Sequence, residues 1–150
     1  MQNFKDYLKE AKYTKTADIE KVEHEDYGQE LIIDIHDVPY DFFTVKNVRS
    51  YAEQLCDEID MKRGPIHTWG ENSQEHKAKH GEGAIKADGI SCIQFLYSSS
   101  ILVHALDEIE KVFVNVFSCN KFDAKKAIQF TEKHIGRSEE HTSELQSHHD

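Results

Sequence analysis

The sequence lacks an apolar segment long enough to cross a membrane, and it lacks the positive charge that nucleic-acid binding requires. The longest apolar run, from Ile90 to Leu106, is interrupted by serines, Gln94 and His104, whereas a spanning helix needs about 20 apolar residues. Lysine and arginine number 18 against 28 aspartates and glutamates, for a formal net charge of -10. We therefore expect neither a membrane nor a nucleic acid as a partner.

Cysteine is scarce and odd in number, which argues against a disulfide framework. The three cysteines, Cys56, Cys92 and Cys119, lie far apart in the sequence, a pattern typical of free thiols in a reducing compartment. The segment MQNFKDYLKEAK carries Asp6 and Glu10 and does not resemble the apolar centre of a secretory signal. We expect a cytoplasmic protein.

Two catalytic signatures are also missing. A triad of Ser99, His104 and Asp107 has no GxSxG elbow, and neighbouring residues of one strand would not converge. Four possible metal ligands are close together in a polar segment, namely His67, His76, His80 and Glu82. However, HKAKH lacks the glutamate of the HExxH zinc signature, and the sequence implies no helix there. We expect no metal ion.

The hydrophobic pattern predicts four strands and two main helices. Apolar, β-prone residues indicate strands at 30–36, 90–97, 101–106 and 111–118. An apolar stripe predicts a helix over 45–59, with Thr44 as N-cap and Gly64-Pro65 as stop, and a second helix over 122–134 is closed by Gly136. Three successive strands joined by short turns favour an antiparallel sheet. The expected fold class is α+β, a two-layer sandwich with an antiparallel sheet covered by helices on one face.

The remaining segments set the expected domain boundaries. Residues 1–136 form a single domain, in which 1–28 hold a short helix (3–12) and a charged connector, and 64–88 form a long loop. Residues 137–150 have almost no apolar content and are expected to be disordered. Their sequence RSEEHTSELQSH resembles the translation of a sequencing-library adapter, which would make this tail a cloning scar.

Three segments resemble the active-site motifs of the bacterial S-adenosylmethionine decarboxylases. The family reads Glu-Ser-His, then His-Thr-Trp-Pro-Glu, then Asp-hydrophobic-Phe-Thr-Cys, and the matching positions here are 98–100 (SSS), 104–108 (HALDE) and 115–119 (NVFSC). The spacing between His104, Glu108 and Cys119 fits without insertion. The resemblance covers roughly 30–134 and implies a domain that binds S-adenosylmethionine, with a GlnB-like or decarboxylase-like sandwich.

The same segments depart from the family where its own chemistry is carried. The decarboxylase cleaves itself before a serine that becomes a pyruvoyl group, and Ser99 occupies that position. Ser98 and Ser100 replace the flanking Glu and His, and Leu106-Asp107 replace Trp-Pro. Without the pyruvoyl group, decarboxylation lacks its electron sink.

The chain also resembles the phage-encoded S-adenosylmethionine lyases, which need neither a metal nor a cofactor. That resemblance implies a homotrimer with sites at subunit interfaces, acting in the cytoplasm of an infected bacterium. The products would be 5′-methylthioadenosine and homoserine lactone, formed when the substrate carboxylate attacks Cγ. A pyruvoyl-dependent decarboxylase processed at Ser99 and a non-catalytic ligand-binding relative are the alternatives.

These resemblances and the residue types assign seven candidate site residues. Glu108 is expected to be catalytic by orienting the substrate, and Tyr97 by placing its ring against the adenine or the sulfonium. The expected substrate-binding residues are Ser99, His104, Asp107, Cys119 and Glu71. Glu71 would act with Trp69 as a lid. Structural roles remain open for several of them, with Cys119 as a small buried side chain and His104 as an ordinary strand histidine.

Overall fold

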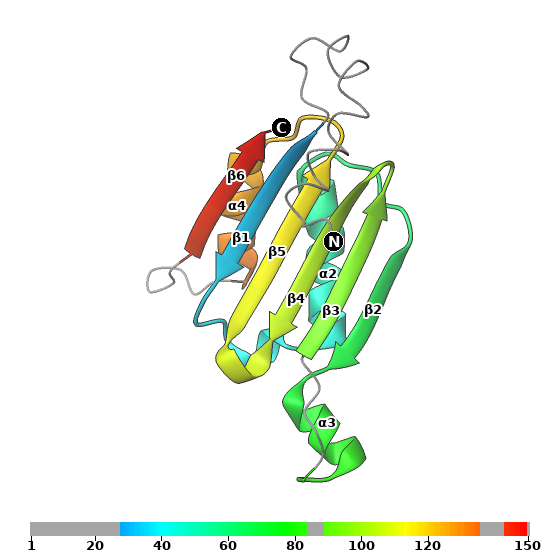
Figure 1. Cartoon of the computed structure of the whole chain (residues 1–150), viewed down its shortest axis with the longest axis vertical. Helices are drawn as coiled ribbons and strands as arrows, with labels where there is room; N and C mark the ends of the chain where they lie inside the picture. The colour runs from blue at the N-terminus through cyan, green and yellow to red at the C-terminus, as the bar shows by residue number, and fades with distance from the viewer. Residues whose placement is uncertain (1–27, 84–88, 136–142, 150) are drawn as a thin grey trace, which may run out of the picture.

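Six strands form one antiparallel sheet in the computed structural model of the chain, which describes residues 28–83, 89–135 and 143–149. The order across the sheet is β2-β3-β4-β5-β1-β6 (Figure 1). The strands are β1 (Gln29–Ile35), β2 (Ile66–Glu71), β3 (Gly89–Leu96), β4 (Ser99–Leu106), β5 (Lys111–Ser118) and β6 (Ser143–His149). The helix and connector expected in 1–28 lie almost wholly outside the described residues.

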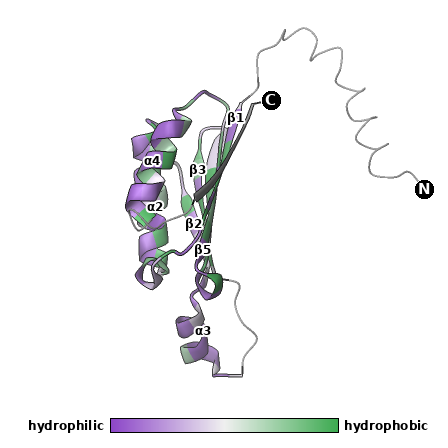
Figure 2. Ribbon diagram, turned by 90° about the vertical axis from the view of Figure 1, so that its left-hand side faces the viewer, coloured by the Kyte–Doolittle hydropathy of each residue, from purple (hydrophilic) through white to green (hydrophobic). Residues whose placement is uncertain are grey.

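Two helices, α2 (Val45–Glu58) and α4 (Ala124–Ile135), cover the same face of this sheet (Figure 2). The α+β two-layer sandwich predicted from the sequence is thus confirmed. Helix α2 begins where expected, because the Thr44 side chain accepts a hydrogen bond of 3.1 Å from the Asn47 amide and so satisfies one free N–H of the first turn. No helix in the described part of the chain is long and apolar enough to span a membrane.

The core lies between the helices and the sheet because alternate strand residues point to one side. Along β1 the residues alternate between buried and half-buried, and Leu31 and Ile33 are fully buried. Helix α2 buries Tyr51 and Leu55 against them. The two helices are joined inside this core by a hydrogen bond of 2.7 Å between the Tyr51 hydroxyl and Thr131 Oγ1.

The opposite face of the sheet carries none of the described helices (Figure 2). It nevertheless presents a row of half-buried apolar side chains, namely Ile32, Ile93, Leu102, Phe113 and Phe117. An apolar face of this kind is typical of a surface that another molecule covers.

The prediction of a loop over residues 64–88 is wrong for most of that segment. Residues Ile66–Glu71 pair with β3 as strand β2, and Ser73–His80 form helix α3. Helix α3 buries no residue, so it has none of the apolar periodicity from which a helix is predicted. Its start is fixed by Asn72 instead, whose Oδ1 accepts a 2.9 Å hydrogen bond from the Glu75 amide.

The tail expected to be disordered over 137–150 contains one described segment, residues 143–149. The backbone of Ser143–His149 forms β6, which pairs with β1 at the edge of the sheet. An edge strand offers unpaired N–H and C=O groups to any extended segment nearby. Backbone pairing of this kind needs no apolar side chains, which is why composition did not predict it.

Candidate functional site

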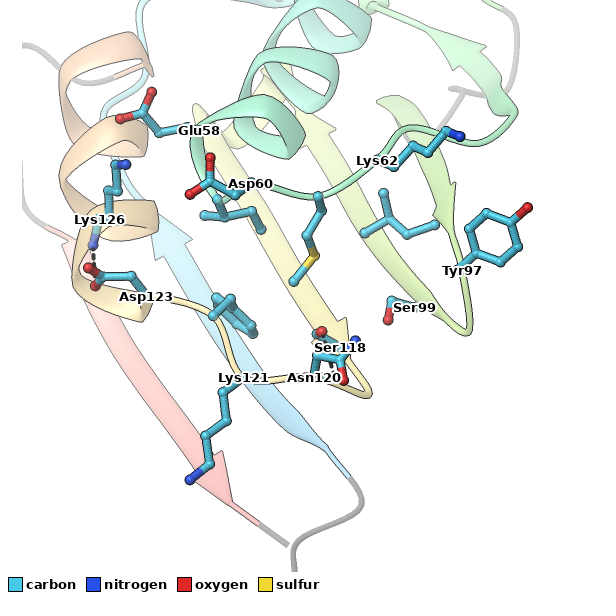
Figure 3. Close-up of a pocket in the computed structure, with 14 residues that line it drawn as sticks. Glu58, Asp60, Lys62, Tyr97, Ser99, Ser118, Asn120, Lys121, Asp123 and Lys126 are labelled. Carbon is cyan, nitrogen blue, oxygen red and sulfur yellow. Dashed lines mark hydrogen bonds between the residues drawn. The ribbon is translucent and has the colours of Figure 1, made fainter.

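A cavity of about 440 Å³ opens at one end of the sheet, where three connections meet (Figure 3). Its walls come from the residues that follow α2, from the β3–β4 hairpin and from the segment between β5 and α4. The lining residues are Glu58, Ile59, Asp60, Met61, Lys62, Leu96, Tyr97, Ser99, Ser118, Asn120, Lys121, Phe122, Asp123 and Lys126. The volume lies in the range of small-molecule sites, about 300–1,000 Å³.

Three of the predicted site residues meet beside this cavity: Tyr97 and Ser99 line it, and Cys119, just after β5, contacts both. The Cys119 amide donates a 3.1 Å hydrogen bond to Ser99 Oγ, and Ser99 Oγ lies 3.7 Å from Cys119 Sγ. The same sulfur contacts the Tyr97 carbonyl at 3.8 Å. The Tyr97 ring stands at the rim and is 85% exposed. The spacing of 20 residues between Ser99 and Cys119 therefore corresponds to a direct contact between β4 and the end of β5.

The cavity carries charges of both signs beside an apolar wall (Figure 3). Its acidic and basic side chains are Glu58, Asp60, Asp123, Lys62, Lys121 and Lys126. Met61, Leu96 and Phe122 supply apolar surface. None of the six charged residues was predicted from the sequence, because they lie on connections and at helix ends and form no motif. The only signal was position, since the segment between β5 and α4 follows residues matched to the family.

Two aspartates of the cavity, Asp60 and Asp123, lie next to the ends of helices. Asp60 lies just beyond α2 with a left-handed backbone, φ 57°, a conformation that Asp and Asn tolerate better than most residues. Asp123 precedes α4, and its Oδ1 accepts a 3.1 Å hydrogen bond from the Lys126 amide. The Asp123 carboxylate is therefore held at the start of α4, and Asp60 lies on the connection that follows α2; both residues line the cavity.

His104 lies on the other face of the sheet from Ser99. The two residues are five positions apart on β4, so their side chains point to opposite faces and their backbones are separated by about 16 Å. His104 Nδ1 lies 2.9 Å from Ser91 Oγ, and its ring contacts Phe113 with centroids 6.2 Å apart. Ser91, which the sequence interpretation did not select, is the partner that orients this histidine.

Asp107 and Glu108 lie at the far end of β4, about 23 Å from Ser99 along the strand. Asp107 Oδ2 accepts hydrogen bonds from the amide, at 3.0 Å, and the hydroxyl of Ser73 at the start of α3. Glu108 is exposed in the short helix η2 (Asp107–Ile109). Ser99, His104 and Asp107 therefore do not converge, as strand geometry predicts, and one chain does not bring Glu108 to Tyr97.

Glu71 is at the same far end, where β2 gives way to α3. Its carboxylate contacts three side chains of that helix, His76, Lys79 and His80. Trp69, its predicted partner in a lid, is 84% exposed. Neither residue lines the cavity beside Ser99. The lid predicted from these two residues is therefore not formed over this cavity within one chain.

Comparison with known proteins identifies relatives of this fold and sequence. A family described as S-adenosylmethionine decarboxylase matches residues 29–148. Among solved structures, the chain is similar to the crystal structure of the adenosylmethionine decarboxylase from Aquifex aeolicus VF5. The two are 17% identical with a TM-score of 0.61, over 83% of this chain and 90% of that one. No curated protein matches the chain significantly.

Proposed function

Because the chain belongs to the S-adenosylmethionine decarboxylase family, we propose that it binds S-adenosylmethionine in the cavity beside Ser99 and cleaves it as a lyase. The products are 5′-methylthioadenosine and homoserine lactone. The observation that supports this most is the composition of the cavity, where carboxylates, ammonium groups and apolar side chains lie within one small-molecule-sized space. S-adenosylmethionine offers a matching set: an ammonium group, a carboxylate, a sulfonium and an adenine ring.

In the proposed reaction, the substrate's own carboxylate is the nucleophile. One carboxylate oxygen attacks Cγ, the bond between Cγ and sulfur breaks, and the sulfur keeps the electron pair as a neutral thioether. The opposite charges of carboxylate and sulfonium disappear as the new bond forms, so a partly dehydrated site favours the transition state. Met61, Leu96 and Phe122 provide that apolar surrounding. Holding the substrate folded supplies the remaining rate enhancement by proximity.

The charged residues of the cavity have a positioning role in this proposal. Asp60 and Glu58 are suited to the ammonium group or the ribose hydroxyls, which form charge-assisted hydrogen bonds with carboxylates. Tyr97 at the rim is suited to stacking on adenine or the sulfonium. Ser99 and Cys119 close the inner end through their mutual contact.

The family match favours a second candidate, the family's own pyruvoyl-dependent decarboxylation. Ser99 occupies the position matched to the processed serine and follows the two-residue turn between β3 and β4, where Ser98 has the left-handed backbone (φ 52°) usual in such turns. The other residues do not fit self-processing within one chain. The Ser99 hydroxyl is engaged by Cys119, and the histidine matched to processing is on the opposite face of the sheet.

Replacement of Asp60 tests the proposed site, and the chain offers a matched control. Asp37 has the same left-handed backbone, φ 56°, but follows β1 at the other end of the sheet. We expect Asp60→Asn to lower kcat/KM for methylthioadenosine release by about tenfold or more, the effect of losing one charge-assisted contact. Asp37→Asn should leave it unchanged. Equal effects of both substitutions would remove Asp60 from the site.

The intact mass of the purified protein separates the two enzyme candidates. Self-processing between Ser98 and Ser99 must yield two chains, whereas the lyase is a single chain. Ser99→Ala would abolish self-processing and with it decarboxylation, so any turnover that this variant keeps needs no pyruvoyl group. S-adenosylmethionine that is bound and recovered unchanged would favour the third possibility, a ligand-binding relative without activity.

A further inference from the structure

We propose that Glu71, His76 and His80 form a binding site for a divalent transition-metal ion, with Zn²⁺ as the best match. Two imidazoles and one carboxylate are a ligand set that zinc sites use repeatedly. The ligand atoms of these three residues all lie within 4.8 Å of one another. The site is separate from the cavity beside Ser99, because it lies where β2 meets α3.

The distances within the cluster are close to those around a bound metal. Glu71 Oε1 lies 3.4 Å from His76 Nδ1 and 3.8 Å from His80 Nε2. Tetrahedral bonds of about 2.0–2.2 Å separate neighbouring ligand atoms by roughly 3.3–3.6 Å. The same carboxylate oxygen thus faces both rings at nearly the required separation, and a small side-chain movement completes the arrangement.

Regular secondary structure supplies the positions of all three ligands. His76 and His80 are four residues apart on α3, which places them on one face of that helix, with ring centroids 4.6 Å apart. Glu71 is the last residue of β2. The sequence argument against a metal rested on the missing glutamate of HExxH and on the absence of a predicted helix over HKAKH. Helix α3 supplies the helix, and Glu71 supplies a carboxylate from outside it.

The junction between β2 and α3 is anchored to the body of the protein. The Asn72 side chain is buried and donates a 2.7 Å hydrogen bond to the Phe43 carbonyl. Ser73 is held by Asp107, as described above. Ligands mounted on a fixed junction lose little conformational freedom on binding, which favours affinity.

Lys79 forms a hydrogen bond with the second oxygen of the Glu71 carboxylate. Its ammonium group donates to Glu71 Oε2, which leaves Oε1 directed at the two histidines. An outer partner that orients a ligand in this way is common in metal sites.

Three protein ligands leave one tetrahedral position open to water or another small donor. The immediate consequence of binding is structural, because the metal would join α3, which buries no residue of its own, to the end of the sheet. A ligand that binds only the folded state raises its stability.

Titration of the metal-free full-length protein with Zn²⁺ and Co²⁺ tests the proposal. We expect one ion per chain at this site, a rise in the unfolding temperature with Zn²⁺, and the visible absorption of tetrahedral Co²⁺. His80→Ala, at a side chain that is 54% exposed, should weaken Zn²⁺ binding about tenfold or more and abolish the Co²⁺ spectrum. Glu71→Gln should do the same.

Two control variants separate this site from other histidines. His67→Ala alters an exposed histidine on β2 outside the cluster, and the double variant H148A/H149A removes the adjacent histidines of the C-terminal segment. Both should bind Zn²⁺ as the unsubstituted protein does, apart from any weaker binding at the terminal pair. Absence of binding, unchanged binding in His80→Ala, or loss of the Co²⁺ spectrum in H148A/H149A would overturn the proposal.

Discussion

Cys119 differs from the other two cysteines in its surroundings. It is half-buried beside the cavity, whereas Cys56 and Cys92 are buried. Burial raises the pKa of both buried thiols to about 11, so few of them are in the reactive thiolate form at neutral pH. The folded protein therefore presents one accessible thiol, in contact with Ser99, which lines the cavity of the proposed ligand.

Alkylation of the native protein with iodoacetamide should therefore modify Cys119 first. Peptide mass spectrometry identifies the modified residue, and unfolding in urea should make all three thiols react. Bound S-adenosylmethionine should slow modification of Cys119 because it occupies the adjoining cavity. An undiminished rate at saturating ligand would place the ligand elsewhere on the molecule.

Tyr51 links α2 to α4 through its hydrogen bond to Thr131, whose own hydroxyl donates to the Ala127 carbonyl at 2.8 Å. Tyr51→Phe should lower the free energy of unfolding by about 0.5–1.5 kcal/mol at neutral pH, the usual net value of one such bond. Burial raises the pKa of Tyr51 far above its usual value. The tyrosine's contribution is thus fully present below the unfolded pKa of about 10 and is lost as the pH rises above it.

Urea unfolding should therefore show that the free energies of unfolding of the unsubstituted protein and of Tyr51→Phe come closer above pH ~10. Only the unsubstituted protein loses this stability there, because phenylalanine cannot ionise. Tyr97→Phe, in an exposed turn, is the control and should show no comparable change. A difference that stays constant into the alkaline range would contradict the buried, protonated tyrosine.

For individual residues, the sequence predicted a contact only where their spacing matches that of the family motifs. Ser99 and Cys119 meet as that spacing implies. Glu108 was selected by the same motif, yet it lies beyond the other end of β4. The strand predicted over 101–106 lies between the two halves of the motif, and its length separates them in the structure.

Among the elements, those with an apolar stripe were predictable and those without one were not. Helix α2 and strands β1, β3, β4 and β5 bury alternating or helical-period residues, so their periods appear in the sequence. Strand β2 is held by pairing with β3, and α3 by the cap at Asn72. Interactions of these kinds depend on partners distant in sequence or on a single polar residue, and leave no hydrophobic period.

Strand β6 allows a test of the proposed domain boundary after Gly136. We expect truncation there to preserve the fold and to change the free energy of unfolding by no more than about 1 kcal/mol. The backbone bonds to β1, worth about 0.5–1.5 kcal/mol each, are offset by an ordering cost of about 1–2 kcal/mol per residue. The sequence of 137–150 holds only one large apolar residue, Leu145.

Circular dichroism and urea unfolding of the truncated chain measure this directly. Because the family match extends through residue 148, the opposite outcome has a clear meaning. A loss of more than about 2 kcal/mol would show that this segment belongs to the domain and would contradict the interpretation as a cloning scar.

For the whole molecule, two observations favour an assembly: one face of the sheet carries none of the described helices, and the two predicted halves of the site are separated. Half-buried Ile93, Leu102 and Phe113 lie on that face, where a second copy would cover them. Within one chain, Tyr97 and Glu108 lie at opposite ends of the sheet. They can therefore contact the same ligand only if they come from two chains. We propose the homotrimer with shared sites on these grounds.

Mixing two inactive variants tests the shared site. Tyr97→Ala and Glu108→Gln should each be inactive alone, and equal mixing with subunit exchange should restore about a quarter of the activity, because each interfacial site draws its halves from two randomly chosen subunits. Native mass spectrometry should show trimers throughout. Full activity of Glu108→Gln alone would reject the shared site, while the cavity beside Ser99 would remain a candidate.

We propose that this chain cleaves S-adenosylmethionine by attack of the substrate's own carboxylate, without a cofactor. Incubation in oxygen-18 water, followed by mass spectrometry of the products, tests it most directly. We predict methylthioadenosine and homoserine lactone, with no heavy oxygen bonded to Cγ. Decarboxylated S-adenosylmethionine, heavy oxygen at Cγ, or unchanged substrate would contradict the claim.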